Sequence, residues 1–420
     1  MKNTIYSLIA LVFLMTSCTK NEHAVPPQTI SKKQKLSSTN TQVSVKDFGA
    51  VGDGTTDDTQ AIKTVMAYAK TNNIQTVYFP SGTYYIKGTG SVGIIPLLNG
   101  VSLVGEGRDV CKIKLSSGRF NPPALFFQAW WDEPAVSNVT ISGIDFDGDI
   151  AHQTYMDTFQ YCHALSINNG ENINVNNCRF ENFRGDGVLF GDVNEPSLNL
   201  RIVKHVVVHD NDFKSIYREG AMFCTTNSAE FYNNYVHGTG YLVGGVDIER
   251  HSVHEQVTNV YVHNNIFDFR DGTGPIERGK IVKYRRAVAI GFFYDGYTNN
   301  TADTLSGGHK IDNNTIYQGQ IDCYNHINVS IIGNTFSSTN EDLSGVTHVT
   351  APAILVSNFK GNEIGLINVH ADNNNITTTM PNGGISFKGY TNCQANGNTL
   401  TGATINMPAQ DGIALNNTIH

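Results

Sequence analysis

The sequence predicts an all-β fold, a single parallel β-helix in which short strands wind into stacked coils. The first observation is an asparagine-rich turn, followed by an apolar residue and a run with alternating apolar positions, which recurs from about residue 139 onward. The second is the irregular spacing of these turns, roughly 20–35 residues, which is typical of solenoids. The third is the period of two within each run, which indicates strands rather than helices.

The turn asparagines predict a ladder along the coils. They are Asn177, Asn211, Asn234, Asn265, Asn314, Asn334, Asn362, Asn398 and Asn417. One coil cannot bury its apolar side alone, so coils must stack and equivalent positions must form columns. Asparagine suits a column at a bend because it tolerates the left-handed region and its amide can bond to the asparagines above and below. Functional residues should therefore be sought in columns rather than in linear motifs.

Residues 1–18 are interpreted as a secretory signal. Lys2 precedes an apolar stretch, residues 5–15, which is shorter than the about 20 residues that a membrane-spanning helix needs. The order resembles a bacterial lipoprotein signal, which implies that Cys18 becomes the lipidated first residue. An ordinary signal peptide with a chance cysteine is the alternative. Residues 19–42, rich in Ser, Thr, Lys and Pro, are expected to be a flexible tether, and residues 43–420 the β-helix domain.

The start of the domain, residues 43–90, is expected to cap the β-helix. Residues 45–62 predict a strand, a Gly/Asp turn and a helix start with Asp or Thr available as N-cap. One face of the predicted helix is apolar and consists of Ala61, Ile62, Val65, Met66 and Ala69. This α-helix can lay its apolar face over the open first coil.

Residues 45–62 closely resemble the N-terminal signature of the pectate-lyase-like superfamily of right-handed β-helix proteins. Residues 76–86, 101–107 and 144–148 continue the resemblance. It implies a carbohydrate-active protein, in a family that includes polygalacturonases, pectate lyases, mannuronan epimerases and phage depolymerases. The signature is specific for the fold and the cap, and it does not specify the reaction.

Composition excludes several kinds of site. A net charge of -8 and a pI of about 5.9 give no electrostatic footprint for nucleic acid. Without Cys18, six cysteines remain, and none has CxxC spacing, so neither a zinc site nor a disulfide framework is indicated. Asp145, Asp147 and Asp149 could bind calcium, but an Asp-Gly turn also explains part of this pattern. We therefore expect no cofactor, with calcium at these aspartates as the alternative.

Alignment of the strands gives the candidate site. Residues 187–190, 220–223, 245–248, 287–290 and 320–323 match if the second and fourth residues of each point inward. Outward positions then carry Asp247, Glu249 and His251 on one coil, and Asp322, Tyr324 and His326 two coils later. The column that begins each strand reads His163, Asp186, Glu219, Gly244 and Arg286. A solvent face that simply carries polar residues is the alternative.

Asp247 and Glu249 are the sharpest candidates for chemistry. Side chains at i and i+2 of a strand share a face about 6.5–7 Å apart at Cα, which suits the paired carboxyl groups of glycosidases. Residues 245–251 also partly resemble the catalytic strand of mannuronan epimerases, Gly-aromatic-Asp-Pro-His-Glu. Asp247 matches the Asp, but Val246 replaces the aromatic residue and Glu249 occupies the His position, which puts epimerase chemistry in doubt.

Basic and aromatic residues give two further hints. The basic residues of one insertion form a cluster that consists of Arg270, Arg278, Lys280, Lys283, Arg285 and Arg286. This cluster could neutralise the carboxylate of a uronic acid, with His251, Tyr324 or His326 as base and acid. The alternative is a solvated loop. Trp130 and Trp131, beside Phe126 and Phe127, could stack on sugar rings or pack locally against the coils.

We therefore expect a lipid-anchored enzyme of the bacterial cell envelope that hydrolyses an extracellular polysaccharide. Asp247 and Glu249 are predicted as the acid and base pair, with Asp322 assisting. The predicted substrate-binding residues are His251, Arg286, Tyr324, His326, Asp186, Glu219, His163, Trp130 and Trp131. A lyase or epimerase acting on a uronic-acid polymer is the first alternative, and a non-catalytic glycan-binding solenoid is the second. The expected partner is a polysaccharide or oligosaccharide, with membrane contact only through the lipid anchor and no nucleic acid.

Overall fold

The computed structural model describes most of the compact unit Asn40–His420. The described residues are 41–87, 93–118, 124–128, 135–153, 161–191, 202–238, 244–250, 255–270, 273–277, 280–283, 288–294, 306–324, 326–339, 352–357, 366–380, 383–388, 390–407 and 412–420. Among these residues, no helix is long and apolar enough to cross a bilayer. The predicted signal and the predicted lipidation site Cys18 lie outside the described residues.

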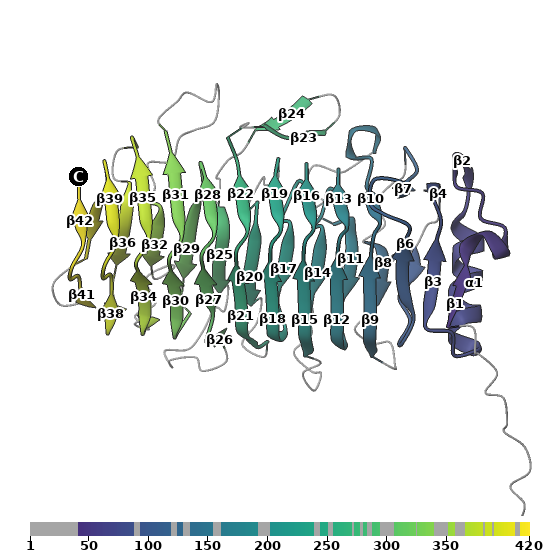
Figure 1. Ribbon diagram of the computed structural model, residues 1–420, viewed down its shortest axis with the longest axis horizontal. Coiled ribbons are helices and arrows are strands. Elements are labelled where there is room, and N and C mark those ends of the chain that lie inside the picture. Colours follow the sequence, from purple (N-terminus) through teal and green to yellow (C-terminus); the bar gives the residue numbers. More distant parts are fainter. Residues whose placement is uncertain are drawn as a thin grey trace, which may run out of the picture. The chain divides into compact units, whose positions relative to one another are not determined.

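The unit is a right-handed parallel β-helix, as predicted, and its coils follow one another in chain order (Figure 1). Three parallel sheets run along it, here called sheets A, B and C. Sheet A contains β1 (Gln42–Ser44), β3 (Thr76–Phe79), β6 (Ser102–Gly105), β9 (Val136–Ser142), β12 (Gly170–Asn176), β15 (Val203–His209), β18 (Thr226–Tyr232), β21 (Val257–His263), β26 (Ser306–Gly307), β27 (Lys310–Asp312), β30 (Val329–Ile332), β34 (Val369–Asp372), β38 (Cys393–Gln394) and β41 (Gly412–Ile413).

Sheet B contains β2 (Asp53–Asp57), β4 (Gly82–Ile86), β7 (Cys111–Leu115), β10 (Asp145–Asp147), β13 (Arg179–Glu181), β16 (Asp212–Lys214), β19 (Tyr235–His237), β22 (Ile266–Asp268), β28 (Thr315–Tyr317), β31 (Thr335–Ser338), β35 (Asn375–Thr378), β39 (Thr399–Thr401) and β42 (Thr418–Ile419). Sheet C contains β5 (Ile95–Pro96), β8 (Ala124–Gln128), β11 (His163–Ile167), β14 (Val188–Phe190), β17 (Ala221–Phe223), β20 (Val246–Arg250), β25 (Val288–Tyr294), β29 (Gln320–Tyr324), β32 (Ile354–Ser357), β36 (Gly384–Lys388) and β40 (Thr404–Asn406).

Two small strand pairs lie apart from these sheets. They are the antiparallel pair β23 (Thr273–Glu277) and β24 (Lys280–Lys283), and the parallel pair β33 (Leu366–Ile367) and β37 (Tyr390–Thr391). Short 3-10 helices span η1 (Val45–Phe48) and η2 (Ile150–His152).

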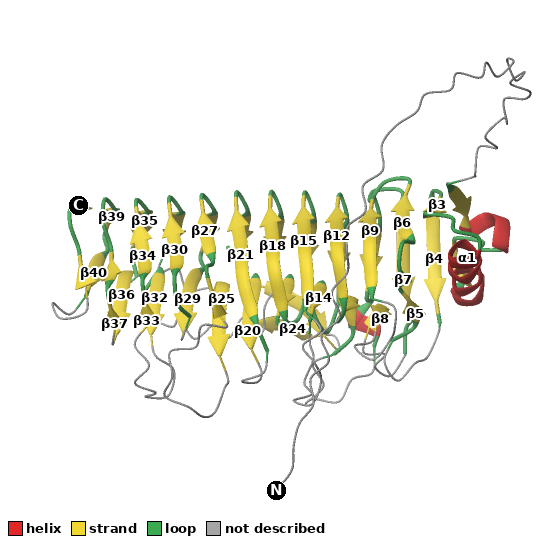
Figure 2. Cartoon of the chain, turned by 90° about the horizontal axis from the view of Figure 1, so that it is seen from below, coloured by secondary structure: helices red, strands yellow, loops and turns green. Residues whose placement is uncertain are grey.

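The helix α1 (Thr59–Thr71) lies at the N-terminal end of the coils, as Figure 2 shows. Ile62, Val65, Met66 and Ala69 are fully buried in the main core, which confirms the predicted apolar face and the cap. Asp58 occupies the N-cap position without a capping bond of its own. Its carboxylate instead accepts the backbone N–H groups of Val51 and Gly52, so it fixes the turn that leads into the helix.

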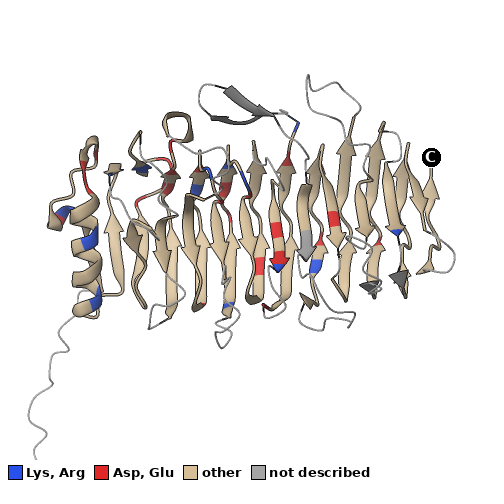
Figure 3. Cartoon of the chain, turned by 180° about the vertical axis from the view of Figure 1, so that it is seen from behind, with Lys and Arg blue, Asp and Glu red and all other residues tan. Residues whose placement is uncertain are grey.

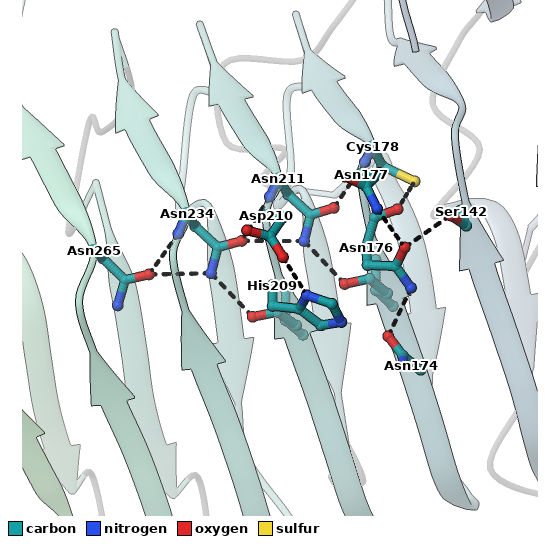
Figure 4. Close-up of polar contacts among 12 residues, drawn as sticks. Ser142, Asn174, Asn176, Asn177, Cys178, His209, Asp210, Asn211, Asn234 and Asn265 are labelled. Atoms are coloured by element: carbon teal, nitrogen blue, oxygen red, sulfur yellow. Dashed lines mark hydrogen bonds and ion pairs between the residues drawn. The ribbon is translucent and has the colours of Figure 1, made fainter. Parts of the chain in front are cut away.

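The asparagine ladder runs along the corner between sheets A and B (Figure 4). Asn234 is representative: its Nδ2 donates to Asn265 Oδ1 at 3.1 Å and to the Val208 carbonyl at 3.0 Å, while its backbone N–H also donates to Asn265 Oδ1. The ladder members are Asn211, Asn234, Asn265, Asn314, Asn334, Asn374, Asn398 and Asn417. Each bend therefore holds the next one in place.

Two positions of the predicted ladder differ in the structure. Asn177 adopts the left-handed conformation, with φ of 51°, and Cys178 occupies the ladder position of that coil. Asn362 lies outside the described residues, and Asn374 stands in the ladder instead. The cause is that each turn uses two residues, a left-handed one and a buried one, and either can be asparagine.

Candidate active site on sheet C

The strand β20 presents two carboxylates on the outer face of sheet C. Val246 and Ile248 belong to the main core, so Asp247 and Glu249 lie on the opposite face of the strand. Asp247 is 2% exposed, whereas Glu249 is partly exposed. The predicted direction of both carboxylates is confirmed by this alternation, although the near-complete burial of Asp247 was not expected.

A glycine separates Asp247 from the next carboxylate in its column. The register pairs Asp247 with Gly291 on β25, and Gly291 with Asp322 on β29. Two strand spacings put the Asp247 and Asp322 Cα atoms about 9–10 Å apart. The predicted strand alignment put Ala289 between Asp247 and Asp322, but Gly291 occupies this position, so no side chain lies between the two carboxylates.

Asp322 is contacted by Gln320 and shares the outer face of β29 with Tyr324, whereas His326 lies elsewhere. Gln320 Nε2 donates to Asp322 Oδ1 at 2.7 Å, and Asp322 is fully buried. Tyr324 shares this outer face, as predicted, and is 9% exposed. The prediction that His326 continues the face was wrong, because β29 ends at Tyr324 and the alternation stops there. His326 is fully buried at the following corner, where its Nδ1 lies 3.1 Å from Nε2 of His309.

The column at the start of the sheet C strands is also present, but it is not a surface groove. His163, Asp186 and Glu219 are 3%, 0% and 0% exposed, so this column is as deeply buried as Asp247 and Asp322. His163 Nδ1 lies 3.0 Å from Asp186 Oδ2 and accepts the backbone N–H of Asp186 at 3.0 Å. Burial raises the pKa of Glu219 well above its ordinary value, against the opposing effect of Arg218.

The predicted alignment of β25 was wrong by two residues. Val246 pairs with Ile290 rather than Val288, and the Gly245 N–H donates to the Val288 carbonyl. Val288 thus lies opposite Gly244, and Arg286, which was predicted for this position, lies outside the described residues. The register also shifts between Val288 and Ile290 where β25 meets β29, which is the signature of one extra residue in a strand.

Arg218 is a site residue that the sequence reasoning missed. Its Nε lies 3.0 Å from Glu219 Oε2 and 3.5 Å from Asp186 Oδ1, and its Nη2 lies 3.5 Å from the Met222 sulfur. Burial disfavours the charged form, but Asp186, Glu219, Asp247 and Glu249 outweigh it and raise the pKa of Arg218. The available signal was its position directly before Glu219, in a column already recognised as acidic.

Apolar side chains continue the outer face toward the N-terminal coils. Leu189, Met222 and Cys224 form a small buried cluster separate from the main core, and Met222 lies beside Asp247 in the register. Of the two alternatives for the aromatic group, local packing holds for Phe126, which is a fully buried core residue of β8. The remaining predicted contacts lie outside the described residues: His251, Arg286, Trp130 and Trp131.

A second charged group lies on sheet B and contains the aspartates considered for calcium. Lys112 Nζ lies 3.1 Å from Asp145, 3.6 Å from Asp147 and 2.7 Å from Glu181, while Lys114 Nζ lies 3.3 Å from Asp149. Ammonium groups therefore stand where a cation would have to bind. Among the described residues, no group of three or more His, Cys, Asp or Glu side chains could hold a metal ion.

Charged residues gather on the N-terminal and central coils, whereas the C-terminal coils carry few (Figure 3). The described carboxylates of the sheet C site outnumber its cations, because Arg218 stands among Asp186, Glu219, Asp247 and Glu249. Charged groups with shifted pKa values that gather in this way are candidates for a functional site.

The family model for rhamnogalacturonase A/epimerase, pectate lyase-like, matches residues 42–274, more than half of the chain. The chain belongs to this family. The matched region includes α1, Arg218 and β20 with its two carboxylates, whereas Asp322 lies beyond it.

Similar proteins act on polysaccharides. Alginate lyase 7 from Azotobacter vinelandii is 32% identical over 224 residues, which cover 49% of this chain and 24% of that protein. Mannuronan C5-epimerase AlgE1 from the same organism is 32% identical over 200 residues, 46% of this chain and 14% of that protein. The chain thus spans about a quarter or less of these two relatives.

Solved structures share the fold. The A-module of the Azotobacter vinelandii mannuronan C5-epimerase AlgE6 has a TM-score of 0.57 at 18% identity, covering 90% of this chain and 99% of that one. An exopolygalacturonase from Thermotoga maritima has a TM-score of 0.53 at 13% identity, covering 90% and 91%. At these identities the likeness shows the β-helix alone.

Proposed function

We propose that this protein is a polysaccharide-cleaving enzyme, a glycoside hydrolase whose site is the outer face of sheet C. The observation that carries the proposal is the arrangement of Asp247, Glu249 and Asp322 on one face, with Gly291 between the two aspartates. Carboxyl groups on one rigid face are what acid and base catalysis of glycosidic cleavage requires.

The spacing of the three carboxylates suits a pair of proton-transfer groups. Asp247 and Glu249 are about 6.5–7 Å apart at Cα, and Asp247 and Asp322 about 9–10 Å. Carboxyl separations of about 5–5.5 Å serve retaining glycosidases, and separations of about 6.5–9.5 Å serve inverting ones. In this proposal Asp247 and Glu249 act as acid and base, while Asp322, positioned by Gln320, stabilises charge at the reacting sugar.

Elimination or epimerisation on a uronic-acid polysaccharide is the second candidate, because the relatives named above include an alginate lyase and a mannuronan C5-epimerase. Such chemistry needs a cation to neutralise the substrate carboxylate and a base to remove the adjacent proton. Arg218 and Tyr324 supply these residue types near β20 and β29. Glu249, which stands where the epimerase strand has a histidine, favours hydrolysis over this candidate.

A paired assay distinguishes the reactions. Alginate, polygalacturonate and neutral glucans are incubated with the protein, and new reducing ends are measured beside the absorbance of unsaturated uronate. Reducing ends without that absorbance support hydrolysis, and both signals together support a lyase. A changed uronate stereochemistry by proton NMR, without either signal, supports an epimerase. Binding without any product supports a glycan-binding solenoid and contradicts the proposal.

Substitutions assign the reaction to sheet C. Asp247→Asn and Glu249→Gln should each lower turnover by roughly 100-fold or more, because each removes a proton-transfer or charge-stabilising group at constant shape. Glu230→Gln, an exposed carboxylate on β18 of sheet A, is the matched control and should keep full activity. Wild-type turnover in both Asp247→Asn and Glu249→Gln would move the site elsewhere.

We also propose that the protein is held in the cell envelope by a lipid on Cys18. The support is the order of a basic residue, a short apolar stretch and a cysteine at the N-terminus. Such an anchor would hold the enzyme at the surface where extracellular polymers arrive.

A further inference from the structure

Two large apolar side chains lie side by side on the outer face of sheet B, on the neighbouring strands β19 and β22 (Figure 1). Tyr235 is 39% exposed and Ile266 is 44% exposed. The two residues are partners in the register, and the residues that follow them, Val236 and Phe267, belong to the main core. Because neighbouring strands are about 4.8 Å apart, the two exposed side chains form one continuous apolar surface.

The same column is polar on the C-terminal coils. After Tyr235 and Ile266 it continues as Thr315, Thr335, Asn375, Thr399 and Thr418. Threonine and asparagine therefore serve at this position, and the fold of a coil does not require a large apolar residue there. An exposed apolar pair in a column that is otherwise polar indicates an interaction surface.

Polar side chains beside this pair are held in fixed positions by one another. Arg270 donates to Asp268 through Nε at 2.8 Å and through Nη2 at 2.5 Å, and its Cζ lies 4.0 Å from the centroid of the Tyr317 ring. The Tyr235 hydroxyl donates to Asp268 Oδ2 at 3.4 Å, and the His237 ring stacks on the Tyr235 ring with centroids 4.3 Å apart. The sheet B platform is the name used here for Tyr235, His237, Ile266, Asp268, Arg270 and Tyr317.

The charges of the sheet B platform are paired, which disfavours a partner recognised by charge. The hydrogen bonds from Arg270 lower the pKa of Asp268, so the two side chains are an ion pair at neutral pH. The Arg270 side chain is nevertheless 59% exposed, so its guanidinium can also bond to a ligand. A sugar ring has an apolar face that stacks on an aromatic ring, and it has hydroxyl groups that bond to guanidinium and carboxylate groups.

The size of the sheet B platform also favours a glycan over a protein. Its strands are β19, β22 and β28, which belong to three successive coils. A stable protein interface buries about 800 Å² on each partner, whereas the next residues of the column are the small polar side chains of Thr315 and Thr335. A surface of this extent suits a few sugar units.

We propose that the sheet B platform is a second polysaccharide-binding site, which holds a polymer by its sugar faces and hydroxyl groups rather than by charge. It lies on sheet B, whereas the carboxylates of the proposed active site lie on sheet C. The choice of a polysaccharide as ligand rests on the proposed function. Binding to the sheet B platform does not require turnover.

Affinity electrophoresis of the full chain measures this binding. The gels contain a soluble neutral glucan, alginate or polygalacturonate, and the parent and all variants carry Asp247→Asn so that the polymers stay intact. Tyr235→Ala should weaken binding of the retained polymer about 10-fold, because it removes the ring on which a sugar stacks. Tyr235→Phe keeps the ring and should bind within about twofold of the parent, because the lost hydroxyl contact is long.

Two further variants test whether the apolar pair acts as a unit. Ile266→Thr introduces the residue type of the next coil and should weaken binding about threefold. Thr399→Ala is the matched control, because Thr399 is exposed at the equivalent position of a C-terminal coil, and it should bind like the parent. All variants should melt within about 2 °C of the parent, since these side chains lie outside the core. Unchanged binding in Tyr235→Ala and Ile266→Thr, or no binding of any polymer by the parent, would overturn the proposal.

Salt distinguishes sugar contacts from ionic attraction. Binding by the parent should persist at about 1 M sodium chloride, where the screening length is only about 3 Å. Binding that disappears at this salt concentration would show recognition by charge and would contradict the proposal.

Kinetics on the chain with Asp247 intact separate the sheet B platform from the active site. Tyr235→Ala should raise KM for the polymer about 10-fold relative to KM for a trisaccharide, which is too short to contact both sheets. An equal rise in both KM values would place Tyr235 in the active site and refute a separate site. Absence of turnover in the wild type would refute the proposed function and leave the electrophoresis result intact.

Discussion

Replacing Asn265 by alanine should destabilise the β-helix more than any exposed substitution nearby. The Asn265 side chain is buried and makes hydrogen bonds on both sides. Its Oδ1 accepts the backbone N–H and the Nδ2 of Asn234 at 2.9 and 3.1 Å, and its Nδ2 donates to the Phe231 carbonyl at 2.8 Å and to Asn314 Oδ1 at 2.9 Å. At about 1 kcal/mol for each bond, the loss in the free energy of unfolding is about 4 kcal/mol.

Urea unfolding followed by circular dichroism measures this loss. Asn264→Gly is the matched control, because Asn264 is the exposed partner in the same turn and its φ of 56° suits glycine. The control should change the free energy of unfolding by less than about 1 kcal/mol. A loss for Asn265→Ala no larger than for Asn264→Gly would refute the reasoning that the ladder stabilises the stacked coils.

Three further outcomes follow from other parts of the chain. Burial and the nearby Glu181 raise the pKa of Asp145 to about 7. The protonated carboxyl group therefore stabilises the fold fully below about pH 4, and this stabilisation is lost as the pH rises through about 7. In urea unfolding, the difference in free energy of unfolding between wild type and Asp145→Asn should change by at most about 4 kcal/mol across this pH range. Ile62→Asp puts an unpaired charge under the cap, where Ile62 is fully buried, and should cost roughly 2–4 kcal/mol in the same assay; an unchanged midpoint would show that α1 does not stabilise the coils. Cys18→Ser should move the protein from the membrane to the soluble fraction of cells, and unchanged fractionation would contradict the proposed anchor.

The fold could be predicted from sequence because its signals are local. Alternation in each strand and one buried asparagine in each turn determine which side chains face the core. In β20, Val246 and Ile248 face the core and Asp247 faces outward, as alternation predicts. The columns of Asp247 with Asp322, and of His163 with Asp186 and Glu219, follow from the same rule applied to successive coils.

The strand register, the burial of sheet C and the charge partners depend on contacts between coils, which the periodicity of the sequence does not encode. The pairing of Val246 with Ile290 instead of Val288 is an example, because the alternation is the same in both registers and only the contact between coils selects one. Burial of the outer face of sheet C, including Asp322, depends on what lies over that face and not on the strand itself. The contacts of Lys112 with Glu181 and of Arg218 with Asp186 were missed because each joins different coils, more than 30 residues apart in the chain.

The turn between sheets A and B keeps a constant length, whereas the other turns of each coil do not. From β12 to β34 the step from sheet A to sheet B takes two residues, such as Asp210 and Asn211 between β15 and β16. The other two corners accept long insertions, as between β14 and β15 or between β31 and β32. Both of these corners border sheet C. Insertions and deletions can therefore reshape the rim of the candidate site during evolution while the asparagine corner keeps every coil in register.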